Sequence, residues 1–466
     1  REELHHGRDV ESALVETMTH AGRSVVVSGS TVAIGLLSMV LLPLPFIRSI
    51  GIGGMLIPLV AVLSTLTLTP ALLYWMGTRI DRFRVIPKRI VSSDPGEKGF
   101  WHNWAAYVVK RPGRVALAGM ALVILLLIPA FKINPSEAEA KNLPGKGDAF
   151  QGRDALGAAG ISEGALKPYV VLVEDGANAQ NLALIVKKLD QTEGVDGASA
   201  PPAWRKDGTG LIEAIPATDG AAKPARKVIS NLQHTVLPDL QEQIGGDVRV
   251  TLSGVAPEDR DFVHAVYGNF PYVLGFVILL TFVLLMRAFR SVVLSIKAVI
   301  LNLISLGCAL GVVVFIFQQG HGSDAIWGIQ ATQAVIAWIP LMIFAFLFGL
   351  SMDYEVFIVT RIREAYDETR DTAKAIELGL ARTGKLVTSA ALVLVFAFFS
   401  LSTGPGPDIK QFGIGLAAGV LIDATIIRAL LVPSLMMLLG RWNWWFPEKV
   451  RRALFVRTPQ PSPQPD

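Results

Sequence analysis

The stretch Gly349-Leu350-Ser351-Met352-Asp353-Tyr354-Glu355-Val356-Phe357 lies inside an apolar run that extends from residue 334 to residue 360. An aspartate in the middle of a membrane helix costs about 2.5–3.5 kcal/mol on insertion scales, and it is tolerated where it faces a bundle interior or a water path. The alternative is a helix end at the membrane interface. Arg361 marks that end, and Asp353 lies about 12 Å inside it at the helical rise per residue. Asp353 is therefore the first candidate for function.

The composition of the chain points to a membrane protein. Of 466 residues, 51% are hydrophobic and only 18% are charged, whereas soluble domains carry about 25% charged residues. Several apolar runs approach the length that crosses a bilayer, which predicts a polytopic α-helical membrane protein. The net charge of +4 comes from basic residues in short loops, so we expect no nucleic-acid partner. Cys308 is the only cysteine, so no disulfide can form within the chain.

Eight membrane spans are predicted from the apolar runs, at residues 24–42, 48–76, 115–131, 268–286, 291–317, 334–360, 385–402 and 409–439. The loops rich in Lys and Arg, at 77–114, 287–290, 361–385 and 441–457, then all fall on one side of the membrane. The positive-inside rule makes this side cytoplasmic and predicts a multi-pass protein of the plasma membrane with residues 132–267 extracytoplasmic.

The segment 132–267 is polar and predicts an α+β domain. Strands are expected at 168–174, 195–203, 210–217 and 247–253, with helices at 178–192 and 221–243. The order β-α-β-β-α-β is that of a ferredoxin-like fold.

An internal repeat divides the chain. Arg1-Glu2 matches Arg363-Glu364, and Ile50-Gly51-Ile52-Gly53 matches Phe412-Gly413-Ile414-Gly415. Both pairs have an offset of 362, as do Arg8-Asp9 with Arg370-Asp371, and Pro43 and Pro45 with Pro405 and Pro407. A fixed offset through two spans and a loop indicates parallel repeats with the same membrane orientation.

The repeat predicts the organisation of the whole chain. Asp353 precedes Arg363 by ten residues, so its counterpart would lie just before Arg1. We therefore expect the C-terminal portion of a longer transporter, whose upstream half is missing and without which proton coupling is incomplete. The expected parts are the last two spans of the first repeat with a preceding cytoplasmic helix (1–76), a basic cytoplasmic linker (77–114), the first span of the second repeat (115–131), the outer domain (132–267), five further spans (268–440) and a cytoplasmic tail (441–466).

The sequence resembles the MMPL (mycobacterial membrane protein large) family of the resistance-nodulation-division (RND) superfamily, the large membrane transporters of actinobacteria. The resemblance rests on Phe348–Phe357, the following Arg361-Ile362-Arg363-Glu364, Phe412–Gly415, and Leu421-Ile422-Asp423-Ala424-Thr425-Ile426-Ile427-Arg428. It implies an RND-type fold with a ferredoxin-like porter domain. It also implies export of lipids or other amphiphiles driven by the proton motive force, in a monomer or homotrimer surrounded by membrane lipids.

The same resemblance implies a proton relay on the tenth span of the family. The positions that match it are Asp353 and Tyr354, whose partners on the fourth span would lie upstream of this chain. The family also places an aromatic residue, here Phe357, and small polar residues of neighbouring spans along the proton channel. We expect Ser351 to line this channel or to support the relay. The alternative for Tyr354 is an anchor at the membrane interface.

Other polar residues of the spans have two readings each. Glu355 points about 200° round the helix from Asp353 if helical rotation is regular, so we expect it to line a cytoplasmic-side cavity or to pair with an arginine. Asp423 and Arg428 are five residues apart, so we expect them not to share a face closely. Asp423 either faces the relay or makes a structural ion pair or polar helix contact. Hydroxyl groups that support the relay or pack helices together are expected from Thr388, Ser389, Ser28 and Ser30.

Other classes of function are disfavoured. Gly413, Gly415 and Gly419 lie within a span and predict close helix packing rather than a nucleotide loop. Without a Walker motif the sequence argues against an ATP-driven pump, and we expect neither an enzyme nor a cofactor; His5-His6 has no companion ligands for a metal site. The alternative function is that of an RND-fold protein that assists translocation or senses lipids, as in SecDF-like or Patched-like proteins.

Overall fold

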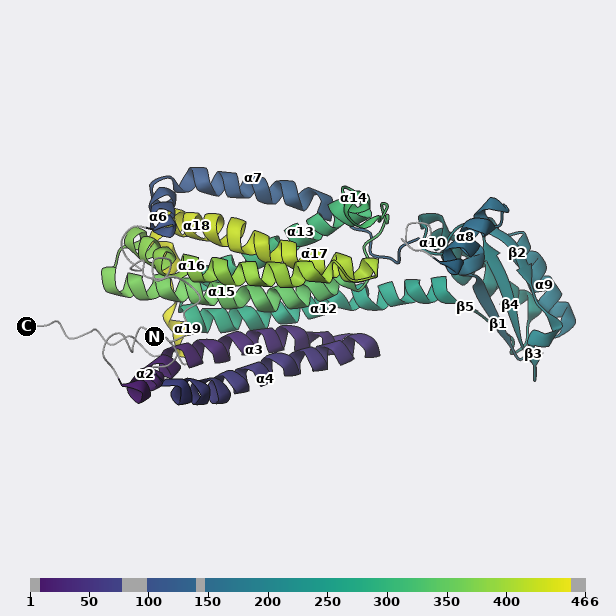
Figure 1. The fold of residues 1–466 in the computed structure, drawn as a ribbon. Helices are drawn as coiled ribbons and strands as arrows, with labels where there is room; N and C mark the ends of the chain where they lie inside the picture. The colour runs from purple at the N-terminus through teal and green to yellow at the C-terminus, as the bar shows by residue number, and fades with distance from the viewer. Residues whose placement is uncertain (1–8, 78–98, 140–146, 454–466) are drawn as a thin grey trace, which may run out of the picture. The chain divides into compact units, whose positions relative to one another are not determined.

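The computed structural model describes residues 9–77, 99–139 and 147–453 (Figure 1). These residues form two compact units. The helical unit comprises Arg1–Phe131, Asn269–Val312 and Leu341–Asp466, and the sheet unit comprises Lys132–Gly268 and Val313–Pro340. The predictions for residues 1–8, for most of the linker 77–114 and for the end of the tail lie outside the described residues.

The helical unit is built from long apolar helices and short connectors. The first part of the chain forms α2 (Val10–Thr17), η1 (Met18–Gly22), α3 (Arg23–Leu37), η2 (Ser38–Leu41), α4 (Pro45–Met76), α6 (Phe100–Lys110) and α7 (Pro112–Ala130). After the sheet unit come α12 (Val255–Phe289, divided between the units), α13 (Val292–Val313), α15 (Ile339–Thr369), α16 (Thr372–Leu401), α17 (Pro407–Ile422), η9 (Asp423–Leu431), α18 (Val432–Leu439), η10 (Gly440–Trp444) and α19 (Glu448–Ala453).

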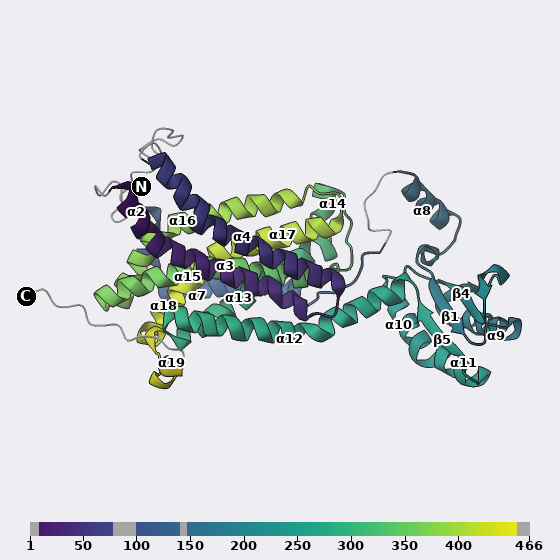
Figure 2. The same cartoon turned by 90° about the horizontal axis from the view of Figure 1, so that it is seen from below.

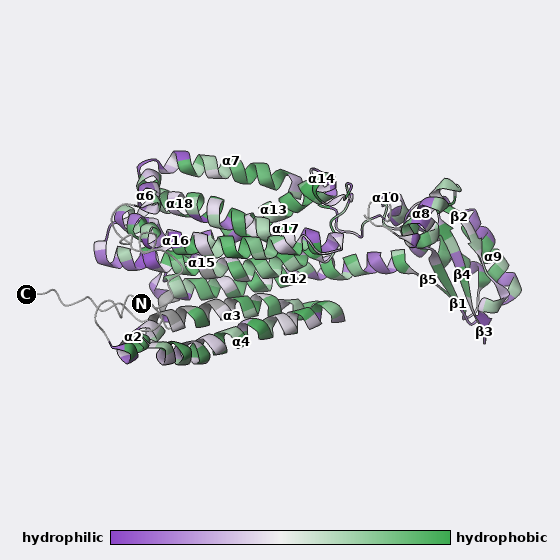
Figure 3. Ribbon diagram, viewed as in Figure 1, coloured by the Kyte–Doolittle hydropathy of each residue, from purple (hydrophilic) through white to green (hydrophobic). Residues whose placement is uncertain are grey.

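Seven helices among the described residues are long and apolar enough to cross a membrane (Figure 3), and each overlaps a predicted span. They are Pro45–Met76, Pro112–Ala130, Val255–Phe289, Val292–Gln318, Ile339–Thr369, Thr372–Leu401 and Pro407–Trp444. The span predicted at 24–42 corresponds to α3 and η2, whose apolar part, Val32–Leu41, is shorter.

Burial distinguishes the helices of this unit. In the most apolar stretch of α15, 71% of the residues are buried inside the protein, against 0% in that of α4. Helix α15 is therefore a central helix, and α4 presents apolar side chains outward, as a helix in contact with lipid does.

The helix pair α3–α4, whose members lie side by side in Figure 2, repeats the contacts of α16–α17. A Cβ added to Gly51 would lie 3.0 Å from both the Leu36 carbonyl oxygen and Met39 Cβ. A Cβ added to Gly413 would meet the carbonyl oxygen of Phe398 at 2.7 Å and Leu401 Cβ at 2.8 Å. All three pairs of positions keep the offset of 362. The close packing predicted for Gly413 is thus confirmed, and the packing follows the sequence repeat.

Single hydrogen bonds follow the repeat as well. Ser38 Oγ donates to the Gly35 carbonyl and Ser400 Oγ to the Ala397 carbonyl, each at 2.6 Å. The carboxylates of Asp9 and Asp371 accept bonds from backbone N–H groups at the start of α2 and of α16. Such caps satisfy donors that the first turn of a helix leaves free, so both repeats begin their helices in the same way.

The sheet unit holds an antiparallel sheet with strand order β2-β4-β1-β5. Its elements are α8 (Asp148–Ala158), η5 (Glu163–Leu166), β1 (Tyr169–Glu174), α9 (Ala179–Asp190), β2 (Val195–Ser199), η6 (Pro202–Trp204), β3 (Arg205–Lys206), β4 (Thr209–Pro216), α10 (Lys223–Asn231), η7 (Leu232–Val236), α11 (Leu237–Ile244) and β5 (Arg249–Ser253). The segments η8 (Val314–Gln318) and α14 (Ser323–Trp327) complete the unit. The strands and helices predicted between 168 and 253 are found, with the two-residue strand β3 added.

The core of this unit explains its order of elements. Alternate residues of β1 (Tyr169, Val171 and Val173) are fully buried and pack with apolar residues of α9, α10 and α11. Alternation along a strand places one face on the core, so these helices cover the same face of the sheet. Burial raises the pKa of Tyr169 to about 12, so this phenol stays neutral inside the core.

Candidate functional site

Helix α15 carries the predicted relay residues through the helical unit. Ser351 and Glu355 are buried, and Tyr354 is half-buried. The backbone of Asp353 lies in the same helix, and its side chain is outside the described residues. Phe357 is half-buried, with Arg361 Cζ 5.8 Å from its ring centroid. The relay role of Asp353 and Tyr354 stays a prediction.

Asp423 and Arg428 form a buried ion pair. Arg428 Nη2 lies 2.6 Å from Asp423 Oδ2, and the side chains are 3% and 7% exposed, respectively. The prediction that these residues do not share a face closely is therefore wrong. The reason is that Asp423–Leu431 is a π-helix, η9, in which backbone bonds join residues five apart, so both side chains project from the same side. Such segments are frequent at functional sites.

Ser351 joins α15 to this ion pair. Its Oγ lies 2.8 Å from both Asp423 Oδ2 and Asn302 Oδ1, the latter on α13. A hydroxyl group has a single proton, so Ser351 can donate to only one of these acceptors at a time. Arg428 Nη2 donates to the Ser351 carbonyl oxygen and lies 3.1 Å from its Oγ. Three helical segments, α13, α15 and η9, thus meet at one serine.

Tyr354 packs on the same arginine. Arg428 Cζ lies 5.1 Å from the centroid of the Tyr354 ring, within the range of a cation–π contact. This contact places the tyrosine of the predicted relay beside the ion pair of η9.

A buried lysine, which was not predicted, belongs to the cluster. Lys297 of α13 is 7% exposed and Glu355 is 3% exposed. The two side chains have opposite charges, which attract one another. Arg428 and Asp423 also act on Glu355. The signal for Lys297 was in the sequence, because it is the only charged residue in the apolar run 291–317. We call Lys297, Ser351, Tyr354, Glu355, Asp423 and Arg428 the charge cluster.

Two small cavities flank the ion pair of the charge cluster. The Asp423 cavity is lined by Asn302, Ser351, Tyr354 and Asp423 among others, and the Arg428 cavity by Trp101, Gly384, Thr388 and Arg428 among others. Each has a volume of about 10 Å³, close to the space that one water molecule needs.

Several buried polar atoms of the charge cluster have no hydrogen-bond partner in the described part of the chain. They are Lys297 Nζ, Glu355 Oε1, Asp423 Oδ1, and Arg428 Nε and Nη1. Leaving such atoms unpaired is costly, and water in a small polar cavity is the usual remedy. The cluster is thus arranged to hold both charge and water.

The predicted hydroxyl residues lie elsewhere. Thr388 Oγ1 donates to the Gly384 carbonyl and Ser389 Oγ to the Lys385 carbonyl, each at 2.8 Å. Thr388 still lines the Arg428 cavity, whereas Ser389 is exposed. Ser30 is half-buried on α3, and the side chain of Ser28 is outside the described residues. Among the hydroxyl side chains of this group that the structure describes, Thr388 alone lies beside the ion pair.

A larger apolar cavity lies between the two repeats. It has a volume of about 380 Å³ and is lined by α3 and α4 together with Phe346, Leu350 and Phe398. A cavity of this size and lining suits an apolar chain.

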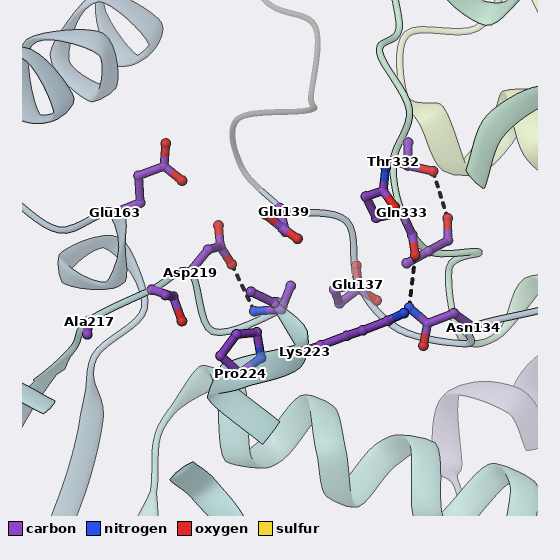
Figure 4. Close-up of a pocket in the computed structure, with 14 residues that line it drawn as sticks. Asn134, Glu137, Glu139, Glu163, Ala217, Asp219, Lys223, Pro224, Thr332 and Gln333 are labelled. Atoms are coloured by element: carbon purple, nitrogen blue, oxygen red, sulfur yellow. Dashed lines mark hydrogen bonds between the residues drawn. The ribbon is translucent and has the colours of Figure 1, made fainter. Parts of the chain in front are cut away.

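The sheet unit has a polar pocket of about 520 Å³ (Figure 4). Four carboxylates and one lysine line it: Glu137, Glu139, Glu163, Asp219 and Lys223. Its walls are fixed by hydrogen bonds, such as Asn134 Nδ2 to the Gln333 carbonyl at 2.9 Å. The described residues contain no group of three or more His, Cys, Asp or Glu placed to hold a metal ion.

The family model described as "MMPL family" matches residues 1–115 and 209–462. The chain belongs to the MMPL family. Membership and the seven apolar helices together indicate a multi-pass membrane protein.

This MMPL chain is similar to three mycobacterial proteins over nearly its whole length. It is 32% identical to "Heme uptake protein MmpL11" of Mycobacterium tuberculosis, covering 100% of this chain and 48% of the relative. It is 30% identical to "Mycolic acid-containing lipids exporter MmpL11" of Mycolicibacterium smegmatis, with 97% and 48% covered. The identity with "Trehalose monomycolate exporter MmpL3" of the same species is also 30%, with 97% and 47% covered. The chain thus spans about half the length of these relatives.

Among solved structures, the MMPL chain is similar to SecDF, a translocon-associated membrane protein from Thermus thermophilus. The TM-score is 0.49 at 13% identity, and the match covers 94% of this chain and 51% of SecDF. This likeness is too weak to bear on function.

Proposed function

We propose that the protein is a secondary transporter of the RND/MMPL type that uses the proton motive force to export lipids or other amphiphilic molecules across the plasma membrane. The observation that carries this proposal is the charge cluster within membrane helices. Charged side chains at this depth are costly, and they mark ion or proton paths. Four charged residues, Lys297, Glu355, Asp423 and Arg428, lie together there on three segments.

In this proposal Asp353 and Tyr354 form the relay and the ion pair of η9 supports it. Tyr354 contacts Arg428, and Ser351 bonds the partner of Arg428. Protonation of a carboxylate in such a cluster removes one charge from a balanced set and changes which contacts are favourable. A change of this kind can shift the populations of two helix arrangements. Proton entry would thereby be coupled to movement of α15 against η9.

The substrate class is supported by cavities and by relatives. An apolar cavity lies in the helical unit, and a polar pocket in the sheet unit, as expected for a protein that handles both parts of an amphiphile. Two of the relatives are named as lipid exporters and one as a heme uptake protein. We propose a lipid-like substrate and keep heme as the second candidate, since heme is also amphiphilic.

The proposed architecture has eight membrane spans, the first at α3 and η2, with domain limits at residues 76, 114, 131, 267 and 440. Residues 132–267 form an extracytoplasmic ferredoxin-like porter domain, and the basic loops are cytoplasmic. The antiparallel strand order β2-β4-β1-β5 supports the domain type. Strand β4 lies between β1 and β2, and β1 lies between β4 and β5, as in the two split βαβ units of a ferredoxin-like fold. Accessibility of single cysteines in the basic loops and in 147–253 to an impermeant reagent on intact cells would test the sidedness. Labelling of the loops alone would contradict it.

An efflux measurement on the Asp353→Asn variant tests the main proposal. Membrane vesicles containing the full-length protein are loaded with a fluorescent lipid, and efflux is followed with and without a proton gradient. We expect Asp353→Asn to abolish gradient-driven efflux and Asp367→Asn to leave it unchanged. Asp367 is a matched control because it lies on the same helix, partly exposed and bridged to Arg363 at 3.3 Å. Efflux that is unchanged by Asp353→Asn would refute proton coupling through this residue, and gradient-driven movement of heme but not lipid would favour the second candidate.

A further inference from the structure

Helix α6 contacts the π-helix next to the ion pair. Trp104 Nε1 donates a hydrogen bond of 2.8 Å to the carbonyl oxygen of Ala429, the residue after Arg428. Ala105 and Val108 of α6 are fully buried, so the helix is docked rather than loosely attached. A tryptophan N–H that caps a carbonyl of η9 fixes the segment from which Arg428 projects.

A second tryptophan of α6 lines the Arg428 cavity. A Cβ added to Gly384 would lie 2.2 Å from the Trp101 ring, so the indole sits directly against the backbone of α16. The same ring lines the cavity together with Thr388 and Arg428. Arg428 Nε and Nη1 lack protein hydrogen-bond partners within the described residues. Trp101 is thus the one residue of α6 that lines the water-sized space beside this buried guanidinium.

We propose that α6 is a gate for the charge cluster: Trp104 holds the π-helical segment that carries Arg428, and Trp101 closes the cavity through which water and protons reach that residue. Movement of α6 would break the Trp104–Ala429 bond and open the Arg428 cavity in one step. The inference rests on the proposed proton-coupled function. It adds the point at which the proton path opens, the Arg428 cavity beside α6. Trp101 and Trp104 are positioning residues, since Trp104 bonds the backbone of η9 and Trp101 packs against the backbone of α16.

Cysteine accessibility tests the gate without any transport assay. Thr388→Cys, made in a Cys308→Ser background, places a thiol in the wall of the Arg428 cavity. Its rate of reaction with a small methanethiosulfonate reagent is measured in membrane vesicles. We expect Trp101→Ala to raise this rate by at least about tenfold, as when a local opening becomes the dominant state. Trp104→Phe should raise it roughly fivefold, the effect of losing one neutral hydrogen bond.

Two further variants make the test decisive. Asn103→Ala is the matched control, because Asn103 lies between the two tryptophans on α6 and is exposed; its labelling rate should not change. Gly384→Ala displaces the Trp101 ring while both tryptophans remain, and should raise the rate as Trp101→Ala does. If Trp101→Ala does not yield folded protein, Gly384→Ala decides the question.

Three outcomes would overturn the gate. Unchanged labelling in Trp101→Ala and Gly384→Ala would show that Trp101 closes nothing. An equal increase in Asn103→Ala would show general loosening of α6. Faster labelling without a passive proton leak, followed with a pH-sensitive dye in the same vesicles, would separate the cavity from the proton path. None of these results depends on Asp353, so failure of the gate and failure of proton coupling remain distinguishable.

Discussion

Arg428 Nη2 lies 2.6 Å from Asp423 Oδ2 although the two residues are five positions apart on one helical segment. A regular α-helix would turn their side chains far from one another, since it advances about 100° per residue. In the π-helix η9 the two side chains instead project from the same side of the segment. The ion pair therefore depends on an unusual backbone. Trp104 of α6 bonds a carbonyl of this backbone, and the Arg428 side chain bonds a backbone carbonyl of α15.

Removing one partner of this ion pair should strongly destabilise the protein. We expect Arg428→Leu to lower the free energy of unfolding by about 3–5 kcal/mol, because it leaves Asp423 buried and uncompensated. Denaturant titration of the detergent-solubilised protein measures this. The double variant Asp423→Leu with Arg428→Leu removes both charges and should recover most of the loss. A double variant no more stable than either single variant would contradict the pairing.

Lys297 and Glu355 should behave as a second coupled pair. We expect Lys297→Met and Glu355→Gln each to reduce gradient-driven efflux and stability, and the double variant to be more stable than either, because the two buried charges balance one another. The coupling is read from a double-mutant cycle. Lys374→Met on the exposed start of α16 is the matched control and should have little effect. Strictly additive losses would show that Lys297 and Glu355 do not interact.

The Ser351 hydroxyl should contribute measurably to the site. We expect Ser351→Ala to cost about 1–3 kcal/mol in the free energy of unfolding, because it leaves buried polar atoms of Asp423 and Asn302 without their shared partner. Ser400→Ala is the control, since Ser400 is exposed and bonds only its own helix. Equal effects of the two substitutions would rule out a special role for Ser351.

The repeated glycine contacts give a matched experiment in one chain. We expect Gly51→Ala and Gly413→Ala each to cost about 1–3 kcal/mol, because the added methyl group meets the backbone of the preceding helix. Gly53→Ala, whose Cβ would have nothing within 4 Å, should be neutral or slightly stabilising. Thermal unfolding of the three variants checks this. Destabilisation by Gly53→Ala alone would show that the packing differs from that described.

The sequence predicted most elements because their signals are local. Apolar runs locate the long helices, and alternation along residues 168–174 locates β1, whose inward residues are buried. The strand β3 was missed because two residues carry no periodicity. Asp353 was predicted to be functional because a carboxylate in hydrocarbon costs free energy. The same argument applied to Lys297 would have found the one member of the charge cluster that was not predicted.

The geometry of the charge cluster could not be predicted in the same way. A π-helix has no composition that distinguishes Asp423–Leu431 from an ordinary membrane helix. Its presence depends on partners distant in the chain, such as Trp104, which lies 325 positions from the carbonyl it bonds. Regular helical rotation was thus the reasonable assumption, and it separated two residues that are in contact.

The matched packing of Gly51 on Leu36 and of Gly413 on Phe398 also has an evolutionary consequence. Duplication gave the protein two copies of one hairpin, yet the positions equivalent to Asp423 and Arg428 fall on apolar or uncharged residues of the first copy, near Val60 and Thr65. The later hairpin thus carries an acid–base pair that the earlier hairpin lacks at the equivalent positions. Under the proposed proton coupling, the earlier hairpin, which has the same glycine contacts without this acid–base pair, is suited to act as the stationary element against which the later hairpin moves.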